Sequence, residues 1–88
     1  MSGDRPWRPR VPPAAVLRRD GARGTDVLLL PERVVVLHGS GRAVLDLCDG
    51  HRTVDEIAGL LSAGADETRV RHEVAAFLDR LRTEGCLR

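Results

Sequence analysis

The sequence predicts an α+β domain of the winged helix-turn-helix-like type, with a three-stranded antiparallel sheet followed by three helices. Two observations lead to this fold class. Apolar runs rich in β-branched residues and separated by turn residues fill residues 16–37, which is typical of paired strands. Capping residues and apolar residues at helical spacing fill residues 40–84, and the last two expected helices are joined by a short glycine-containing turn.

Three short strands are expected in the first half of the chain. The first runs from Val16 to the Asp-Gly turn at residue 20, and the second covers residues 27–30. The third covers residues 33–37, where three consecutive valines disfavour a helix and suit a pleated sheet. Because Pro31 presets φ for the first central position of a tight turn, the second and third strands are predicted to form a hairpin closed by Leu-Pro-Glu-Arg.

Two short helices are expected next. Ser40 is placed as the N-cap of the first, and Gly50 ends it because glycine readily takes the left-handed conformation that stops a helix. Its apolar residues are Val44, Leu45, Leu47 and Cys48. Thr53 and Glu56 have the spacing of a capping box, which opens the second helix. The Ser-Ala-Gly-Ala segment at residues 62–65 ends that helix.

The third helix is expected to be the longest. Asp66 caps its start, the helix runs to about Glu84, and Gly85 closes it. Its apolar residues follow the spacing of a single buried stripe. They are Val70, Val74, Phe77, Leu78 and Leu81.

The start of the chain has a different character from the rest. Four of the five prolines lie in residues 1–13, together with several arginines, and no helical or strand period is visible there. We therefore expect an extended Pro/Arg-rich N-terminal arm at residues 1–13 and a single recognition domain at residues 14–88. The arm carries Trp7, which either tucks onto the domain or contacts a partner.

Length and composition limit the possible functions. The 88 residues suffice for one small domain, and 42% hydrophobic with 31% charged residues is an ordinary balance for a globular chain. No apolar run approaches the roughly 20 residues that cross a bilayer, so we expect a cytoplasmic protein that makes no membrane contact. A core of this size contributes little net stability, so either a monomer or a weak homodimer is expected.

The residues that could support catalysis or bind a metal are few. Cys48 and His51 form a Cys-x-x-His pair, which is typical of half a zinc site, and His72 and Cys86 are the other soft ligands considered. However, Cys48 falls within an apolar helical stripe, and His72 and Cys86 do not have the spacing of a ligand pair. We therefore predict no catalytic residues, no metal and no cofactor.

Charge argues against nucleic acid as the partner. A helix-turn-helix would place its second helix, here residues 66–84, in the major groove. The arginines of that segment are offset by carboxylates that would repel phosphates. The basic residues are Arg69, Arg71, Arg80 and Arg82, and the acidic residues are Asp66, Glu67, Glu73, Asp79 and Glu84. A small winged-helix DNA-binding regulator remains the alternative from another functional class.

The third expected strand offers a different kind of site. At the edge of a three-stranded sheet, residues 33–37 could present unpaired N–H and C=O groups to an extended peptide. Alternatively, the edge is blunted by charge or covered by the N-terminal arm. The residues alone leave these two interpretations open.

Several motifs together resemble a known family. They are LLPE at residues 29–32, VVL at 35–37, AVLDLCDG at 43–50 and TxxEI at 53–57. In this combination the chain resembles, from about residue 13 to residue 87, the PqqD family, the small peptide chaperones of pyrroloquinoline quinone biosynthesis.

The resemblance implies a function and a set of binding residues. Members of this family are not enzymes; they bind a ribosomally made precursor peptide in extended form along the third strand, beside the third helix. They present it to a radical S-adenosylmethionine (radical SAM) enzyme, which crosslinks a Glu and a Tyr of the precursor. Carried onto this chain, the peptide-binding residues are Val34, Val35, Val36 and Leu37 of the strand and Arg71, Val74, Ala75 and Leu78 of the helix.

One departure from the family pattern bears on the identity of the peptide. Where relatives usually have Leu-Asn, a variable pair and a small residue, this chain has Leu-His-Gly-Ser-Gly at residues 37–41. The added glycines and histidine loosen the base of the expected groove. The partner is therefore either the quinone precursor or another modified peptide, of the mycofactocin or lasso type.

Overall fold

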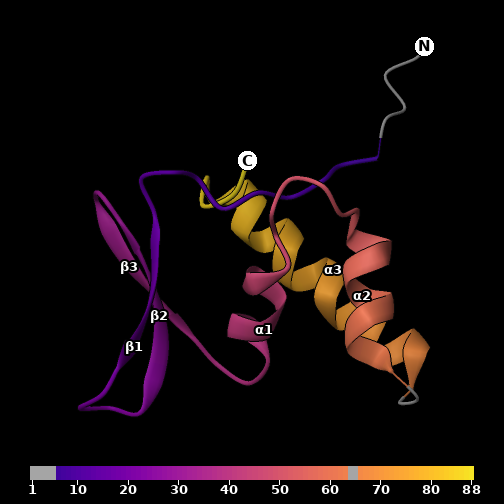
Figure 1. The fold of residues 1–88 in the computed structure, drawn as a ribbon, viewed down its shortest axis with the longest axis horizontal. Coiled ribbons are helices and arrows are strands. Elements are labelled where there is room, and N and C mark those ends of the chain that lie inside the picture. Colours follow the sequence, from indigo (N-terminus) through magenta and orange to yellow (C-terminus); the bar gives the residue numbers. More distant parts are fainter. Residues whose placement is uncertain (1–5, 64–65) are drawn as a thin grey trace.

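The protein has three strands followed by three helices, in the order that the sequence predicts (Figure 1). The computed structural model describes residues 6–63 and 66–88. The elements are β1 (Val16–Asp20), β2 (Thr25–Leu30), β3 (Arg33–Leu37), α1 (Gly41–Asp46), α2 (Val54–Ser62) and α3 (Glu67–Thr83). None of the helices in the described ranges is both long and apolar enough to cross a membrane. The predicted α+β fold class is confirmed.

The sheet is antiparallel and β2 is its central strand. β2 begins at Thr25, two residues before the predicted start at Val27, because Thr25 and Asp26 pair with Asp20 and Arg19 of β1. The earlier start was not predicted because Thr25 and Asp26 are polar and carry no apolar signal. The pairing lengthens the β1–β2 hairpin beyond the apolar run.

The predicted hairpin between β2 and β3 is confirmed. Leu30 pairs with Arg33, and Pro31 and Glu32 form the two-residue turn between them. The hairpin therefore places β3 at an edge of the sheet, with β2 as its neighbour on one side only within the described residues.

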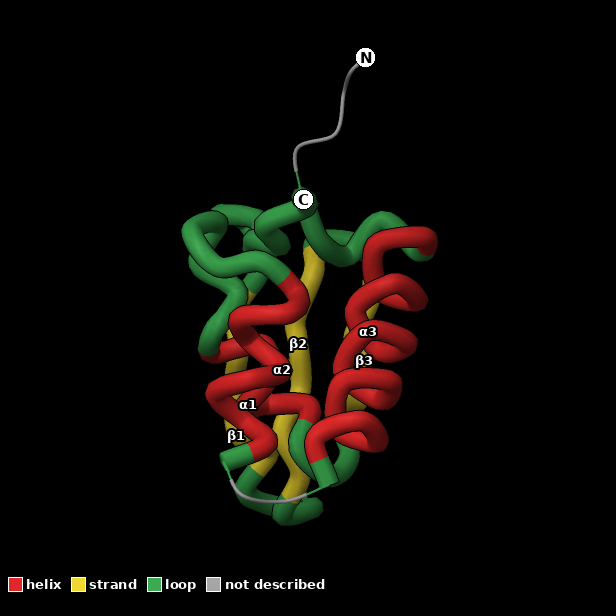
Figure 2. Tube along the Cα trace, turned by 90° about the vertical axis from the view of Figure 1, so that its right-hand side faces the viewer, coloured by secondary structure: helices red, strands yellow, loops and turns green. Residues whose placement is uncertain are grey.

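The two faces of the sheet differ in what covers them. All three helices lie against one face, where they cover Leu28 and Leu37 (Figure 2). Val35, opposite Leu28, points to the same face and packs against the core. Val34 and Val36 point to the other face and are exposed. β3 therefore carries apolar side chains on both faces of the sheet, because successive side chains of a strand alternate between the faces.

α1 is shorter than predicted. The helix ends at Asp46, and Leu47 and Cys48 form a tight turn instead of a further helical turn. The Leu47 N–H donates to the Val44 carbonyl at 3.1 Å, and the Cys48 N–H donates to the Leu45 carbonyl at 3.0 Å. These three-residue spacings are those of a 3₁₀ turn, which commonly ends a short helix.

The start of α1 lies close to α3. Ser40 occupies the predicted N-cap position, but its side chain makes no capping hydrogen bond. At Gly41, a Cβ would lie 3.3 Å from the Phe77 ring and 3.4 Å from the Leu37 Cβ. Glycine at this position therefore lets the start of α1 approach both β3 and α3.

The predicted caps of α2 and α3 are confirmed. The Thr53 N–H donates to the Glu56 carboxylate at 2.8 Å, and the Glu56 N–H donates to the Thr53 hydroxyl at 3.1 Å. Asp66 accepts from the Arg69 N–H at 3.2 Å. Of the predicted break at residues 62–65, Gly64 and Ala65 lie outside the described residues.

The core lies between the helices and the covered face of the sheet. Its buried residues are Leu28, Leu37, Val44, Leu45, Cys48, Ile57, Ala58, Val74, Leu78, Leu81, Cys86 and Leu87. Burial, with a smaller effect of Asp49, raises the pKa of the Cys48 thiol to about 12. Cys48 therefore stays protonated and packs as a small apolar side chain.

Residues 6–13 are extended but lie on the domain, next to the C-terminal end of the chain. Arg10 and Arg88 exchange two backbone hydrogen bonds, each of 2.9 Å. The Gly50 N–H donates to the Pro9 carbonyl at 3.0 Å, and the Val11 N–H donates to the Cys48 carbonyl at 3.2 Å. This segment closes the end of the core rather than covering β3.

Trp7 also packs onto the domain. Its indole N–H donates to the Arg88 carbonyl at 3.2 Å, and the Arg82 guanidinium lies 4.4 Å from the ring centroid. Of the two alternatives left open by the sequence, the structure shows the first, in which Trp7 packs against the domain. Arg82 is thereby held on the side of α3 that faces the N-terminal segment.

Candidate functional site

β3 presents one free edge. A two-residue turn bonds the Leu30 carbonyl to the Arg33 N–H, and in an antiparallel ladder such bonded pairs alternate along the strand. Arg33, Val35 and Leu37 therefore direct their backbone groups to β2. Val34 and Val36 direct theirs away from the sheet, and their side chains are 59% and 41% exposed. Two residues of β3 can thus accept a further strand.

α3 lies alongside β3, and we call the space between the edge of β3 and the facing side of α3 the groove. At the start of β3, the Arg33 guanidinium donates to the Glu84 carbonyl just after α3. Near the end of β3, Leu37 and Phe77 both approach Gly41. The strand and the helix therefore run in opposite directions with matching ends, and Figure 2 shows α3 in front of β3.

A hollow of about 420 Å³ lies at the end of this groove, where the chain leaves β3. It is lined by Val70, Glu73, Val74 and Phe77 of α3, by Leu61 of α2, by Val44 of α1, and by residues 38–41 where the chain leaves the strand. The backbone at Gly39 has φ of 56°, which favours glycine. The unusual Leu-His-Gly-Ser-Gly segment thus forms part of the hollow.

Three of the sequence-predicted binding residues belong to the core. Leu37 and Val74 are each 4% exposed, and Leu78 is fully buried. Leu37 contributes backbone to β3, and Val74, although nearly buried, lines the floor of the hollow. Leu78 is absent from the lining and packs beneath it in the core.

Two other predicted residues lie on the side of α3 that faces α2 and the N-terminal segment. Arg71 binds Asp55 of α2 at 2.6 Å and Glu67 at 2.8 Å. The hydrogen bonds to Glu67 and Asp55 raise the pKa of the Arg71 guanidinium. Ala75 lines a separate shallow depression beside Trp7. Both residues therefore face α2 and the N-terminal segment.

The angular positions of the residues around α3 explain why Arg71 and Ala75 face α2 and not β3. At about 100° per residue, Phe77 lies about 60° to one side of buried Val74 and Arg71 about 60° to the other. We call Val70, Glu73, Phe77 and Arg80 the open flank of α3, because the first three line the hollow and Arg80 stacks on Phe77. We call Arg71, Ala75 and Arg82 the covered flank.

Sequence reasoning placed the histidine and glycines of residues 38–41 at the groove, but it did not place Glu73 or Arg80 there, and it assigned Val70 and Phe77 only to the core stripe. Val70 and Phe77 are in fact half-buried. The one signal in the sequence was Glu73, a charged residue between Val70 and Phe77 in an otherwise apolar stripe. It marks the side of the stripe that reaches the surface.

Acidic residues near the start of α2 have structural roles. Hydrogen bonds from the Thr53 backbone and hydroxyl lower the pKa of Glu56. The His51 backbone N–H, followed by nearby Arg52, lowers the pKa of Asp49. In the described part of the chain, no group of three or more His, Cys, Asp or Glu residues is placed to hold a metal ion.

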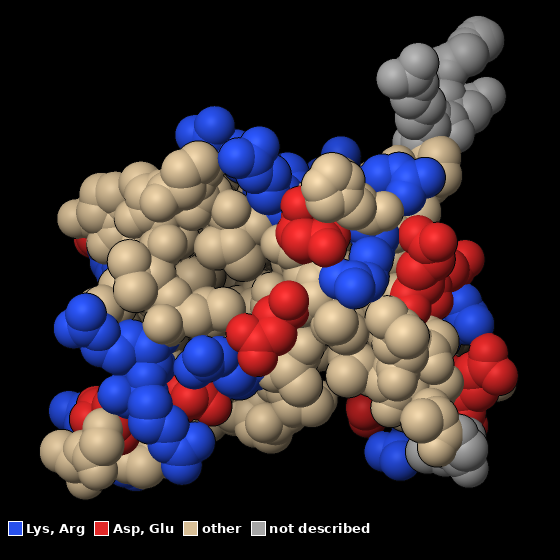
Figure 3. Space-filling view, in the orientation of Figure 1, with Lys and Arg blue, Asp and Glu red and all other residues tan. Residues whose placement is uncertain are grey.

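The arginines of α3 do not form a basic surface. Arg69 contacts Glu73 at 3.5 Å, Arg71 is bound by two carboxylates, and Arg82 stacks on Trp7. A phosphate backbone at α3 would therefore meet carboxylates beside the arginines. Figure 3 shows the side of the molecule away from α3, where acidic and basic side chains are also intermixed.

A strand edge beside an amphipathic helix with an apolar hollow defines the class of the protein. It is a small α+β domain of the kind that can bind an extended peptide by adding a strand to its sheet.

Comparison with known proteins identifies the family. The model of the family described as "Coenzyme PQQ synthesis protein D (PqqD)" matches residues 27–87, and the chain belongs to this family. A curated relative, the "PqqA binding protein" of Rhodopseudomonas palustris (strain BisB5), is 38% identical over 82 residues, which are 91% of this chain and 80% of the relative.

Two solved structures have the same fold. The solution NMR structure of the PqqD truncation of Methylobacterium extorquens PqqCD has a TM-score of 0.77 and 36% identity, and covers 91% of this chain and 87% of that one. It is described as a functional, stand-alone recognition element for ribosomally synthesized and modified peptides. PqqD from Xanthomonas campestris has a TM-score of 0.62 and 32% identity, over 100% and 98% of the two chains.

Proposed function

We propose that this protein is a non-catalytic chaperone that binds a ribosomally made precursor peptide in pyrroloquinoline quinone biosynthesis. The peptide adds a strand to β3. The observation that carries this proposal is the free edge of β3, where Val34 and Val36 direct their backbone groups outward, with the hollow lying just beyond the end of the strand. Its relatives are named PqqA binding proteins, which supports PqqA as the peptide.

The proposed contacts are of two kinds. The backbone groups of Val34 and Val36 give main-chain hydrogen bonds, which hold a peptide of any sequence, and the pockets give specificity. Val70 and Phe77 would contact an apolar peptide side chain in the hollow. Of the helix residues first expected to form the wall, Val74 would form the floor of the hollow and Leu78 would support it from the core. Arg71 and Ala75 would not touch the peptide.

We further propose that the bound peptide is presented to a radical SAM enzyme in the cytoplasm. Strand addition fixes one segment of a peptide and leaves its remaining residues free for an enzyme. The two free, buried cysteines suit a reducing compartment, where thiols persist. Ribosomally made precursors also first appear there.

A titration of isotopically labelled protein with synthetic Rhodopseudomonas palustris PqqA tests the proposal. The backbone amides of Val34, Val36, Val70 and Phe77 should shift most, and those of β1 should shift least. A mycofactocin precursor and a lasso precursor serve as competitors. Shifts with one of these but not with PqqA would reassign the peptide, and shifts confined to β1 or α2 would reject the β3 edge.

A titration with duplex DNA tests the alternative that the protein is a DNA-binding regulator. Binding that weakens steeply as salt rises would indicate phosphate contacts. The balanced charges of α3 predict no such binding.

A further inference from the structure

We propose that Arg80 selects an acidic side chain of the bound peptide, placed two or four residues from the apolar side chain that enters the hollow. The inference rests on the proposed function, because it concerns which peptides the β3 edge accepts. It adds a charge requirement that neither the family nor the strand addition itself implies.

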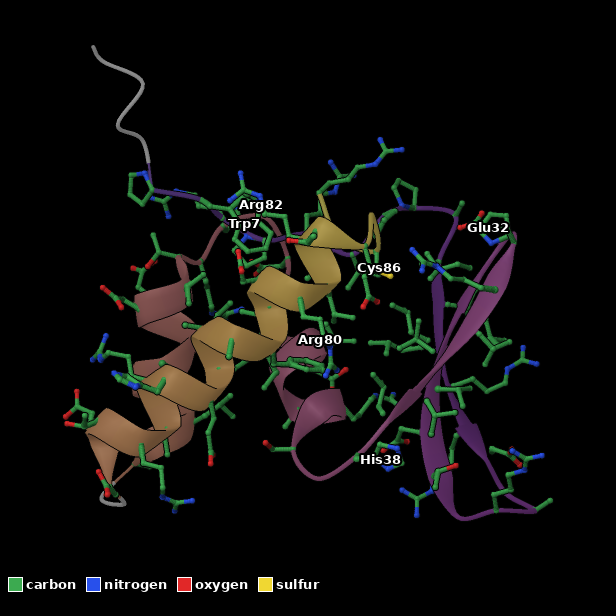
Figure 4. All side chains as sticks on the ribbon, turned by 180° about the vertical axis from the view of Figure 1, so that it is seen from behind. Trp7, Glu32, His38, Arg80, Arg82 and Cys86 are labelled. Carbon is green, nitrogen blue, oxygen red and sulfur yellow. The ribbon has the colours of Figure 1, made fainter. Side chains whose placement is uncertain are left out.

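Arg80 is held at the groove by its stacking on Phe77. The Arg80 guanidinium carbon lies 5.7 Å from the centroid of the Phe77 ring, and Phe77 lines the hollow. Figure 4 shows Arg80 on the side of α3 that faces the sheet, whereas Arg82 lies beside Trp7. A stacked guanidinium still has its N–H groups at the edge of the plane, where they can bind a carboxylate in a bidentate manner.

The other arginines of α3 are already engaged elsewhere. Arg69 and Arg71 pair with carboxylates, and Arg82 lies over Trp7 on the covered flank. Within the described residues, Arg80 makes no ion pair with a carboxylate. It is therefore the α3 arginine whose charge is available at the groove.

The open flank of α3 carries an acidic residue at the hollow and a basic residue further along the helix. Glu73 lines the hollow, where it also contacts Arg69 at 3.5 Å, and Arg80 follows seven residues later on the same flank, about 10 Å along the helix axis. A peptide with its acidic residue toward Arg80 and away from Glu73 matches this order of charges.

The extended form of the peptide sets the spacing. Successive side chains of a strand point to opposite faces, and those on one face are about 6.6–7 Å apart. One apolar side chain in the hollow and one acidic side chain at Arg80 must share a face. An even separation satisfies the alternation, and two or four residues, which span about 7 Å and about 14 Å, bracket the distance of about 10 Å along α3.

The test uses a matched pair of arginines and a scanned peptide. Arg80→Glu and Arg82→Glu remove similar exposed, ring-stacked arginines from opposite flanks of α3. Affinity is measured for synthetic Rhodopseudomonas palustris PqqA and for variants in which each Asp or Glu is changed, one at a time, to Asn or Gln. Circular dichroism confirms that both protein variants are folded.

We expect Arg80→Glu to weaken binding at least about fivefold and Arg82→Glu to leave it unchanged. One amide substitution in the peptide should weaken binding to the wild type but not to Arg80→Glu, and Lys at that position should restore binding to Arg80→Glu. Equal effects of the two arginine variants, or no sensitive acid in the peptide, would overturn the inference while leaving the proposed function intact. If wild-type protein binds no form of the peptide, both fail together.

Discussion

The two flanks of α3 differ in whether their polar groups find partners inside the protein. On the covered flank, Arg71 binds two carboxylates and Arg82 stacks on Trp7, which the N-terminal segment brings into place. On the open flank, Phe77 lines a hollow near the end of β3, and Arg80 lies over the Phe77 ring. One helix thus completes the fold on one side and borders the proposed binding surface on the other.

The largest expected effect concerns the core that both flanks share. Leu78 is fully buried, so Leu78→Ala should lower the free energy of unfolding by about 2–5 kcal/mol through lost burial and a new cavity. Denaturant unfolding measures this loss. If Leu78→Ala instead keeps its stability and loses only peptide affinity, the side chain contacts the peptide and our phase for α3 is wrong.

Phe77 tests the open flank alone. Phe77→Ala should weaken the binding of PqqA by about tenfold, because the ring lines the hollow and supports Arg80. Calorimetric titration gives the affinity. Arg71→Ala is the control from the covered flank, and it should leave the affinity unchanged. An equal loss of affinity in both variants would contradict the proposal that only the open flank contacts the peptide.

Low pH should destabilise the start of α2, where Glu56 forms the capping box with Thr53. The pKa of Glu56 is lowered by its hydrogen bonds with Thr53, so this carboxylate stabilises the fold above its ordinary pKa, and the contribution is lost as pH falls through the lowered value. Thermal unfolding of wild type should therefore occur at lower temperature as pH drops from 6 to about 3. Glu56→Gln should reduce this dependence, and an unchanged slope would contradict the role of the capping box.

The sequence predicted the features that depend on neighbours along the chain. The Thr53–Glu56 capping box, the Pro31 turn and the Asp66 cap each need only a few adjacent residues, so their signals are complete in the sequence. The strands and helices, and the strand edge proposed as the site, follow from such signals together with the family resemblance.

The side of α3 that borders the groove could not be predicted in the same way. Val70, Val74, Phe77, Leu78 and Leu81 form a stripe wide enough to serve both the core and the hollow. Its rotation depends on contacts between residues distant in sequence, such as Arg33 with Glu84 and Gly41 with Phe77. Trp7 likewise meets Arg88 from the opposite end of the chain.

The binding of PqqA to two proline variants tests the central claim most directly. Val36→Pro removes an N–H that faces outward from β3, and Arg19→Pro makes the same change on the outward edge of β1, since β2 bonds β1 through its alternate residues. With both variants folded, we predict that Val36→Pro abolishes binding and Arg19→Pro retains it. Retained binding by Val36→Pro, or loss by Arg19→Pro alone, would show that the peptide does not add to β3.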